Sequence, residues 1–376
     1  MHSQPNPRSL EGLLIGRNNN FGLIRHLAAL SVLYGHSFIF WPNSGGADAI
    51  RSFTGIEYSG SLAVFAFFFL SGILVSQSWT RQDNVKNFVA LRFSRIWPAL
   101  FVCVTLIVFV GAPVFSNLPY SQFISNKETV GFFVKNITLF DGVRFSLPGV
   151  FEHNAIRAVN GALWTLPVEI GCYCIVLCLG LLRFSKTRLG AMIGVMLTFA
   201  GWLALFRVHP PGAMLNALVS KPGDFTAYPV IFFLCGFIAF HFRSLVVIRL
   251  DVAAILCVVY LLNRSTEAGH AIFYVAFIYL ILVVAASRYL RKYEPTWDIS
   301  YGVYVYGFFV QQCFAALFPA QNVYVGLLIS VVVSVILASL SWRFIEQPAI
   351  SFTRRWLGKK SAVPAPWARS ADLETR

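Results

Sequence analysis

The sequence predicts an all-α, polytopic membrane protein with about ten transmembrane helices and both termini in the cytosol. Hydrophobic residues make up 57% of the 376 residues, charged residues only 12%, and the mean hydropathy is +0.67. These values lie far from those of soluble domains. Lys and Arg, which give a net charge of +14, gather between apolar segments, where cytosolic loops carry them. The charge therefore follows membrane topology, and we expect no nucleic acid partner.

Ten apolar segments have about the length that a bilayer requires. They lie at residues 21–40, 61–79, 96–115, 162–182, 189–206, 227–242, 247–262, 271–287, 299–317 and 323–341. We expect residues 1–20 to form a cytosolic segment, residues 21–350 the transmembrane domain, and residues 351–376 a basic, disordered tail. The polar first twenty residues are followed by no A-x-A-like site, so the sequence does not predict a cleaved signal peptide.

Alternate connections between these segments carry the positive charge. Their basic residues are Arg81, Lys86, Arg92, Arg95, Arg183, Lys186, Arg188, Arg243, Arg249, Arg288, Arg291, Lys292, Arg354, Arg355, Lys359 and Lys360. By the positive-inside rule these connections face the cytosol. The longest external connection, residues 116–161, contains an amphipathic stretch, VGFFVKNITLF. A connection of that length usually has a function or packs on the membrane surface.

The first predicted helix places Arg25 and His36 on one face. Eleven residues at about 100° each complete about three turns and separate the two side chains by ~16 Å along the axis. An Arg in hydrocarbon costs about 2.5 to 3.5 kcal/mol, so it normally pairs or faces a polar cavity. Arg25 alone would also suit a snorkelling side chain, and His36 alone a core histidine with satisfied hydrogen bonds. Their shared face favours a functional role for both.

Two further polar groups are candidates for chemistry. Arg92 and Arg95, in RFSRIWP just before the third segment, lie on one side of a helical start, and paired guanidinium groups suit phosphate oxygens. A topological anchor would look the same. Glu169, about two turns into the fourth segment, must pair or stay protonated. It suits a structural ion pair as well as a catalytic acid or base.

The ninth segment, DISYGVYVYGFFVQQ at residues 298–312, is unusually polar for a membrane helix. Its polar side chains are Ser300, Tyr301, Tyr304, Tyr306, Gln311 and Gln312. Such side chains either hold helices together or line a cavity, and periodicity alone does not separate the two.

The cysteines and the missing motifs narrow the chemistry. All seven cysteines lie in apolar segments, which does not predict a disulfide framework. Cys172, Cys174 and Cys178 have no nearby set of His and acidic ligands, so packing thiols are favoured and no metal is expected. The chain lacks a Gly-rich phosphate loop, an H-E-x-x-H motif and a nucleophile elbow. A nucleotide-like ligand would therefore be held by Arg side chains and helix ends.

Taken together, these motifs resemble those of the acyltransferase 3 family of integral membrane acyltransferases, which includes bacterial O-acetylases of surface polysaccharides. Arg25 and His36 match the family's R/K-x10-H pattern, and Arg92 and Arg95 match its R-x-x-R. Further similar segments lie at residues 68–74, 163–169, 300–312 and 341–348. These six segments follow the family's order, and the resemblance covers most of the membrane region.

The resemblance implies an O-acyltransferase of the bacterial inner membrane. It would move an acyl group, usually acetyl, from cytosolic acyl-CoA to a hydroxyl of an extracytoplasmic polysaccharide or lipid-linked oligosaccharide. His36 would be the base, with an acyl-histidine intermediate as the alternative. Arg92 and Arg95 would bind the CoA phosphates, Arg25 would guide the donor, and Glu169 would orient or charge-balance His36 or Arg25. Acyl-CoA would be a donor substrate, with membrane lipid around the chain and no permanently bound cofactor.

Two positions depart from the family pattern. Members often have Asp three residues before the Arg of the first helix, where this chain has Gly22, so the local ion-pair partner of Arg25 is lost or replaced. Phe309 stands where a kink-forming proline is common. Both positions bear on the geometry of the site rather than on His36.

Other functions stay open. A transporter or flippase of lipid-linked sugars would also place polar groups at mid-membrane, although such folds commonly show repeated halves with broken helices, which are not evident here. A sensor derived from an acyltransferase would have lost its chemistry, and Gly22 is the hint of that. Within the family, a small-molecule acceptor such as a macrolide or a Nod-factor-like oligosaccharide fits as well.

Overall fold

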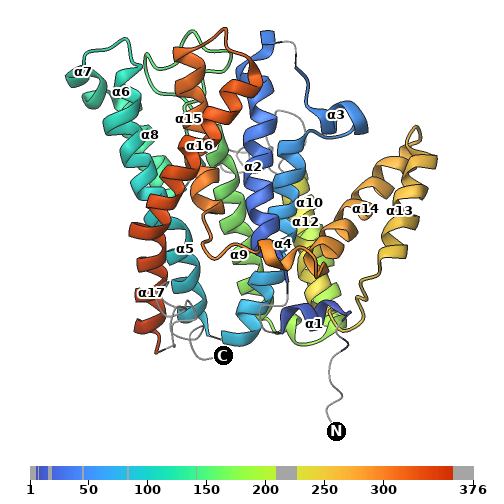
Figure 1. The fold of residues 1–376 in the computed structure, drawn as a ribbon. Helices are drawn as coiled ribbons and strands as arrows, with labels where there is room; N and C mark the ends of the chain where they lie inside the picture. The colour runs from blue at the N-terminus through green and yellow to red at the C-terminus, as the bar shows by residue number, and fades with distance from the viewer. Residues whose placement is uncertain are drawn as a thin grey trace, which may run out of the picture.

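A computed structural model describes residues 6, 8–15, 19–44, 46–82, 84–140, 142–208 and 227–358. These residues form a bundle of helices without strands (Figure 1), which confirms the all-α prediction. The α-helices are α1 (Leu10–Leu14), α2 (Phe21–Phe40), α3 (Ala49–Thr54), α4 (Ser59–Gln82), α5 (Val85–Leu106), α6 (Ala112–Val114), α7 (Tyr120–Ser125), α8 (Lys127–Thr138), α9 (Thr165–Leu181), α10 (Arg188–Val208), α12 (Ala227–His241), α13 (Leu250–Asn263), α14 (Glu267–Ala286), α15 (Ser300–Leu317), α16 (Val323–Ser341) and α17 (Gln347–Trp356). A 3-10 turn, η3 (Gly161–Trp164), precedes α9.

Each of the ten predicted apolar segments is helical. Within the described ranges, six helical stretches are long and apolar enough to cross a membrane: Phe21–Phe40, Ser59–Gln82, Val85–Val114, Gly161–Leu181, Glu267–Ala286 and Val323–Trp356. Three shorter apolar helices lie at Arg188–Gly201, Tyr228–His241 and Leu250–Asn263. The chain is therefore a multi-pass membrane protein, whereas ten spans and cytosolic termini stay predictions.

Helix α4 forms one wall of the bundle interior. Most of its side chains are buried, including Phe65, Phe69 and Ile73. It packs closely on α12, because a Cβ atom at Gly72 would lie only 2.1 Å from the carbonyl oxygen of Phe233. Small residues at such crossings let membrane helices approach backbone to backbone. The path of α4 through the bundle is therefore tightly fixed.

Helix α5 begins earlier than the predicted third segment. Its N-cap residue Asn84 accepts a hydrogen bond from the Asn87 amide at 3.1 Å, and the helix starts at Val85 rather than near residue 96. The first turns of α5 are too polar for a hydropathy profile to detect where the helix starts. Its start is set by the side-chain cap. The R-x-x-R motif consequently lies inside a helix, not at its start.

Both ends of the chain contain helices that the sequence did not predict. Leu10 and Leu13 of α1 are buried, and the Leu10 amide donates to the Val246 carbonyl at 2.9 Å. Helix α17 crosses the predicted domain boundary at residue 350. The tail predicted at residues 351–376 begins inside this helix, and its part beyond residue 358 lies outside the described residues.

Helices α1 and α17 lie at one end of the bundle, here named the α1 end, and α3 and α7 lie at the opposite, α3 end (Figure 1). The long predicted connection at residues 116–161 covers part of the α3 end, and its amphipathic stretch is α8. The Asn160 side chain donates to the Val305 carbonyl at 2.8 Å. The connection therefore ties η3, and with it the start of α9, to α15.

Candidate active site

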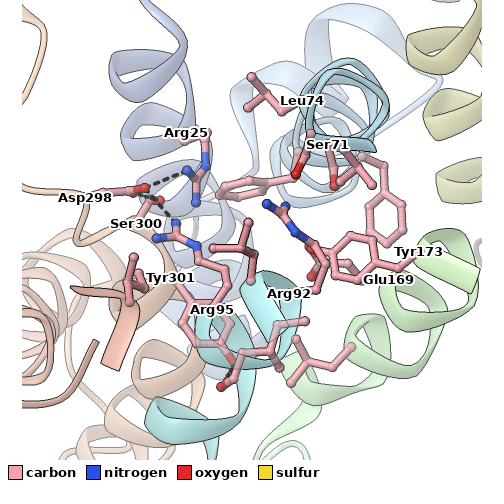
Figure 2. A pocket seen from close by; sticks show the side chains of 18 of the residues that line it. Arg25, Ser71, Leu74, Arg92, Arg95, Glu169, Tyr173, Asp298, Ser300 and Tyr301 are labelled. Atoms are coloured by element: carbon pink, nitrogen blue, oxygen red, sulfur yellow. Dashed lines mark hydrogen bonds and ion pairs between the residues drawn. The ribbon is translucent and has the colours of Figure 1, made fainter. Parts of the chain in front are cut away.

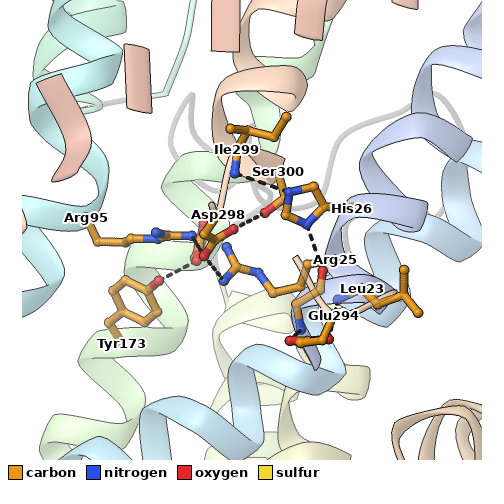
Figure 3. A network of polar contacts seen from close by, with 11 residues as sticks. Leu23, Arg25, His26, Arg95, Tyr173, Glu294, Asp298, Ile299 and Ser300 are labelled. Carbon is orange, nitrogen blue, oxygen red and sulfur yellow. Dashed lines mark hydrogen bonds and ion pairs between the residues drawn. The ribbon is translucent and has the colours of Figure 1, made fainter. Parts of the chain in front are cut away.

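The first turn of α2 is held by the connection between α14 and α15. The Glu294 carboxylate accepts hydrogen bonds from the amides of Gly22 (2.9 Å) and Leu23 (3.0 Å), as Figure 3 shows. A Cβ atom at Gly22 would lie 2.4 Å from Glu294 Oε1, so glycine leaves the space that this carboxylate fills. A negative group is favourable at the N-terminus of a helix. Glu294 therefore caps α2 from outside the helix.

Asp298 joins two arginines from different helices. Its Oδ2 lies 2.6 Å from Arg25 Nη1 of α2 and 2.7 Å from Arg95 Nη2 of α5, and its Oδ1 accepts from the Ser300 hydroxyl at 2.7 Å. Burial opposes ionisation of this carboxyl, but Arg25 and Arg95 outweigh burial and hold the pKa of Asp298 well below its usual range. Asp298 is thus the partner that Arg25 lacks on its own helix. Arg25 belongs to a charge network and does not snorkel.

A cavity of about 530 Å³ adjoins this network (Figure 2). Along α4 its lining runs from Val64 to Gln82, eighteen positions or about 27 Å of helix. Gln82 and Arg354 of α17 place one part of the lining at the α1 end. Thr165, the first residue of α9, and Tyr304 of α15 line the other extreme. The cavity therefore reaches deep into the bundle from the α1 end.

The lining of the cavity is strongly basic. Five arginines contribute to it, namely Arg25, Arg81, Arg92, Arg95 and Arg354. Two carboxylates, Glu169 and Asp298, also contribute, so five positive and two negative groups leave a formal charge of +3. A cleft lined by one sign of charge concentrates ligands of the opposite sign. The cavity is therefore suited to an anionic ligand.

Arg92 is the arginine best placed to bind such a ligand. It makes no hydrogen bond or ion pair with any described residue, and its Nε is buried. Its guanidinium lies 5.7 Å from the centroid of the Tyr173 ring and points into the cavity toward Ser71 (Figure 2). A buried polar group without a partner costs about 1–3 kcal/mol, and a ligand oxygen would remove that cost. Arg95 differs, because Asp298 already occupies its guanidinium.

Glu169 of α9 also lines the cavity. It accepts a hydrogen bond from the Tyr173 hydroxyl, one turn further along α9. Among the described residues it forms no ion pair at contact distance, although it lies close enough to Arg25 for their charges to interact. The ion pair that the sequence left open for Glu169 is therefore not formed. No described contact joins Glu169 to His36.

His36 lies outside the cavity lining, apart from the other four predicted residues. Its ring packs edge-on against Phe308 of α15, with 5.1 Å between ring centroids, and against Phe40 at 6.3 Å. Nδ1 is buried, and neither ring nitrogen forms a hydrogen bond with a described residue. This imidazole is not a core histidine with satisfied hydrogen bonds.

The position of His36 along the bundle axis can be derived from the contact of its neighbour Gly35. A Cβ atom at Gly35 would lie 2.8 Å from the backbone nitrogen of Gly60, near the start of α4. Val64, the lining residue nearest to that start, follows four positions later, or about 6 Å along the helix. The imidazole therefore lies about one turn beyond the deep extreme of the cavity.

Comparison with known proteins identifies the family. Residues 18–343 match a family model described as an acyltransferase domain, and this range contains Arg25, His36, Arg92, Arg95 and Glu169. The chain belongs to the acyltransferase 3 family.

Relatives of this acyltransferase agree with that assignment. An O-acetyl transferase from Shigella phage Sf6 is 28% identical over 345 residues, covering 88% of this chain and 96% of the relative. Nodulation protein 10 from Rhizobium leguminosarum bv. viciae is 24% identical over 372 residues, covering 93% and 97%. No solved structure matches the chain. The family and the O-acetyl transferase relative make the chain an O-acyltransferase.

Sequence analysis of this acyltransferase does not identify Asp298 as the carboxylate that pairs with Arg25 and Arg95. Asp298 begins the polar segment at residues 298–312, but nothing in the sequence pairs it with Arg25 and Arg95, which lie far from it along the chain. Gly22 is the signal that points to it. A membrane Arg without a partner on its own helix requires one from elsewhere, and acidic residues bordering polar segments are the candidates.

Proposed function

We propose that this acyltransferase takes an acetyl group from cytosolic acetyl-CoA and transfers it to a hydroxyl of an extracytoplasmic glycan or lipid-linked sugar. The membrane would be the bacterial inner membrane, with the α1 end in the cytosol. One observation carries the proposal: a basic cavity, whose Arg92 makes no hydrogen bond or ion pair with a described residue, runs from the α1 end to within about one helical turn of His36. Donor and acceptor can thus approach from opposite ends of the bundle.

The donor's chemistry fits the two parts of the cavity. CoA carries its negative charge on phosphate groups and its thioester on a thin, uncharged arm. Arg92 binds a phosphate oxygen through a charge-assisted hydrogen bond, and Arg95 adds positive potential beside it. The arm then runs along α4 past Leu74 and Phe68, toward Thr165. Arg25 stays paired with Asp298, and Glu169 balances charge on the donor side.

His36 supplies the base. The acceptor hydroxyl oxygen bonds to the acyl carbon of the thioester, and the carbon–sulfur bond breaks. The hydroxyl proton passes to the imidazole and then to the CoA thiolate, which leaves as the thiol. General base catalysis of this kind contributes about 10² to 10⁴ in rate. In the alternative route an imidazole nitrogen takes the acyl group first and passes it to the hydroxyl.

The names of the relatives bear on the transferred group and on the acceptor. The phage relative is named an O-acetyl transferase, which supports acetyl as the transferred group. The second relative is named a nodulation protein, which keeps a Nod-factor-like oligosaccharide as the second candidate. A transporter of lipid-linked sugars, the candidate from another class, predicts that acyl-CoA is neither bound nor consumed.

Mass spectrometry of the surface glycan, with and without the gene, tests this proposal. Deletion should remove one acetyl mass per repeat, and the wild-type gene should restore it, whereas a gene carrying His36→Ala should not. A deletion strain that keeps a fully acetylated glycan would exclude the glycan as acceptor. Loss of the glycan itself from the surface would favour the transporter.

A further inference from the structure

Two aromatic residues of α15 lie between the deep extreme of the cavity and His36. Tyr304 lines the cavity, and Phe308 follows one turn later and packs on the imidazole. Both are buried, at 8% and 6% exposure. The bound thioester and His36 must meet for transfer, so one of these side chains has to give way.

Tyr304 is fixed by hydrogen bonds. Its hydroxyl donates to the Ala162 carbonyl at 2.9 Å and lies 2.8 Å from Thr165 Oγ1. Its ring also packs edge-on against Phe67 of α4, at 6.0 Å between centroids. Moving this side chain would leave buried polar groups without partners, which is costly. Tyr304 therefore marks a fixed end of the cavity.

Phe308 is held by packing alone in the described contacts. Its ring centroid lies 5.1 Å from that of His36 and 5.0 Å from that of Phe40. On another side, a Cβ atom at Gly161 would lie 2.7 Å from the Phe308 ring, so the ring rests directly on the η3 backbone. Changing its rotamer loses dispersion contacts but no hydrogen bond. Phe308 is therefore the side chain that can move.

We propose that Phe308 is a movable partition between the donor cavity and His36, and that its volume limits the length of the acyl group that is transferred. This inference rests on the proposed function, because only a donor in the cavity has to reach the imidazole. A short acyl group passes with a small displacement of the ring. To let a longer acyl group pass, the Phe308 ring must leave the space that it fills against Gly161 and Phe40. Phe308 is thus a specificity-determining residue.

The test compares acetyl-CoA with butyryl-CoA as donors for the purified, full-length protein. Transfer is measured as labelled acyl incorporated into the envelope fraction of a strain that lacks the gene, and binding of each donor is measured on the same samples. Phe308→Ala should raise the butyryl-to-acetyl ratio of transfer about tenfold or more, with little change in acetyl-CoA affinity. Phe308→Leu, a smaller change for the fold, should raise it less.

Two further variants act as controls. Phe309→Ala removes the next ring of α15, which packs on Phe151 and Gly111 and has no described contact with Phe308 or His36, so it should leave the ratio unchanged. Gly161→Ala presses against the Phe308 ring, so it should lower kcat for both donors while their dissociation constants stay the same.

The outcomes separate the two proposals. Equal ratios in the wild type, Phe308→Ala and Phe308→Leu, with donor binding intact, would overturn the partition. The same change of ratio in Phe309→Ala would reduce Phe308 to a general packing residue and also overturn it. A wild-type protein that binds neither donor would instead overturn the proposed function.

Discussion

The two ends of α2 have opposite surroundings. Arg25 borders a cavity that is lined by five arginines, Arg25 included, and two carboxylates, and the Arg25 and Arg95 guanidinium groups share the Asp298 carboxylate. Around His36, the neighbours are aromatic rings, and Nδ1 is buried without a partner. Under the proposed function, ligand binding and chemistry therefore lie in separate compartments about 16 Å apart along one helix.

The difference between these ends has a physical reason. Charged groups can stay inside a membrane protein when they pair or reach a polar cavity, and the groups at the Arg25 end do both. A base has to exchange its proton during the reaction, so strong ion pairs around His36 would hold it in one protonation state. Under the proposed function, the apolar walls around the imidazole would also keep water from the thioester.

The largest effect should come from His36→Ala. Transfer should fall by about 10² to 10⁴, because general base catalysis is lost, whereas acetyl-CoA should bind as it does to the wild type. Single-turnover transfer and equilibrium binding on one sample measure both. Near-normal transfer would place the base elsewhere, and lost binding would show that the two compartments are not separate.

Arg92→Ala should have the reverse pattern. Acetyl-CoA affinity should fall about 10- to 100-fold, the loss expected for a hydrogen bond to a charged group. Arg92→Lys should retain part of the affinity, since it keeps the positive charge but loses the planar guanidinium group, which can donate two parallel hydrogen bonds. Arg355→Ala is the matched control, because Arg355 is exposed and does not line the cavity. Equal losses in the Arg92→Ala and Arg355→Ala variants would contradict a specific role for Arg92.

Asp298→Asn should destabilise the Arg25 end by about 1–3 kcal/mol, because two partly buried arginines lose their shared counter-charge. The pKa of Asp298 is lowered in the fold, so its contribution to stability is present above the unfolded value of about 4 and is lost as the pH falls below it. The wild-type melting temperature should therefore decrease below pH 4 more steeply than that of Asp298→Asn. Parallel pH profiles for the two proteins would exclude this ion pair as a source of stability.

The smallest effect is expected at the cap of α2. Glu294→Ala should cost about 0.5–2 kcal/mol, as for other N-cap losses. Gly22→Asp should also destabilise the protein, because its side chain meets the Glu294 carboxylate. In the double variant, the new Asp can cap the helix from within and should recover part of the loss. If thermal unfolding of the double variant shows the sum of the two single losses of stability, Asp at position 22 does not replace Glu294 as the cap.

Most of the architecture follows from the sequence, since helices of membrane length are set by apolar runs. The ends that hydropathy misses are those set by side-chain caps, as at Asn84 of α5, or by burial of a few leucines, as in α1. Arg25, Arg92, Arg95 and Glu169 fall in one cavity because three helices (α2, α5 and α9) and the α14–α15 connection bring them together. No pattern along the chain contains that three-dimensional information.

The separation of compartments also depends on contacts between segments far apart in sequence. Phe308 meets His36 because α15 packs on α2, and Gly161 meets Phe308 because Asn160 bonds to α15. Periodicity indicates that the ninth segment is polar but not which of its faces meets α2. The alternatives for that segment, helix contact or cavity lining, therefore both apply: Tyr304 lines the cavity and Gln311 donates to the Leu33 carbonyl at 2.8 Å.

The central claim is that the donor occupies the basic cavity and stops short of His36. The most direct test is an electron cryomicroscopy structure of the full-length protein in lipid nanodiscs with a non-hydrolysable thioether analogue of acetyl-CoA. We expect density for a phosphate against Arg92, for the arm along α4, and for the acyl end on the cavity side of Tyr304. Density for the analogue at any other place, or a phosphate far from Arg92, would contradict it.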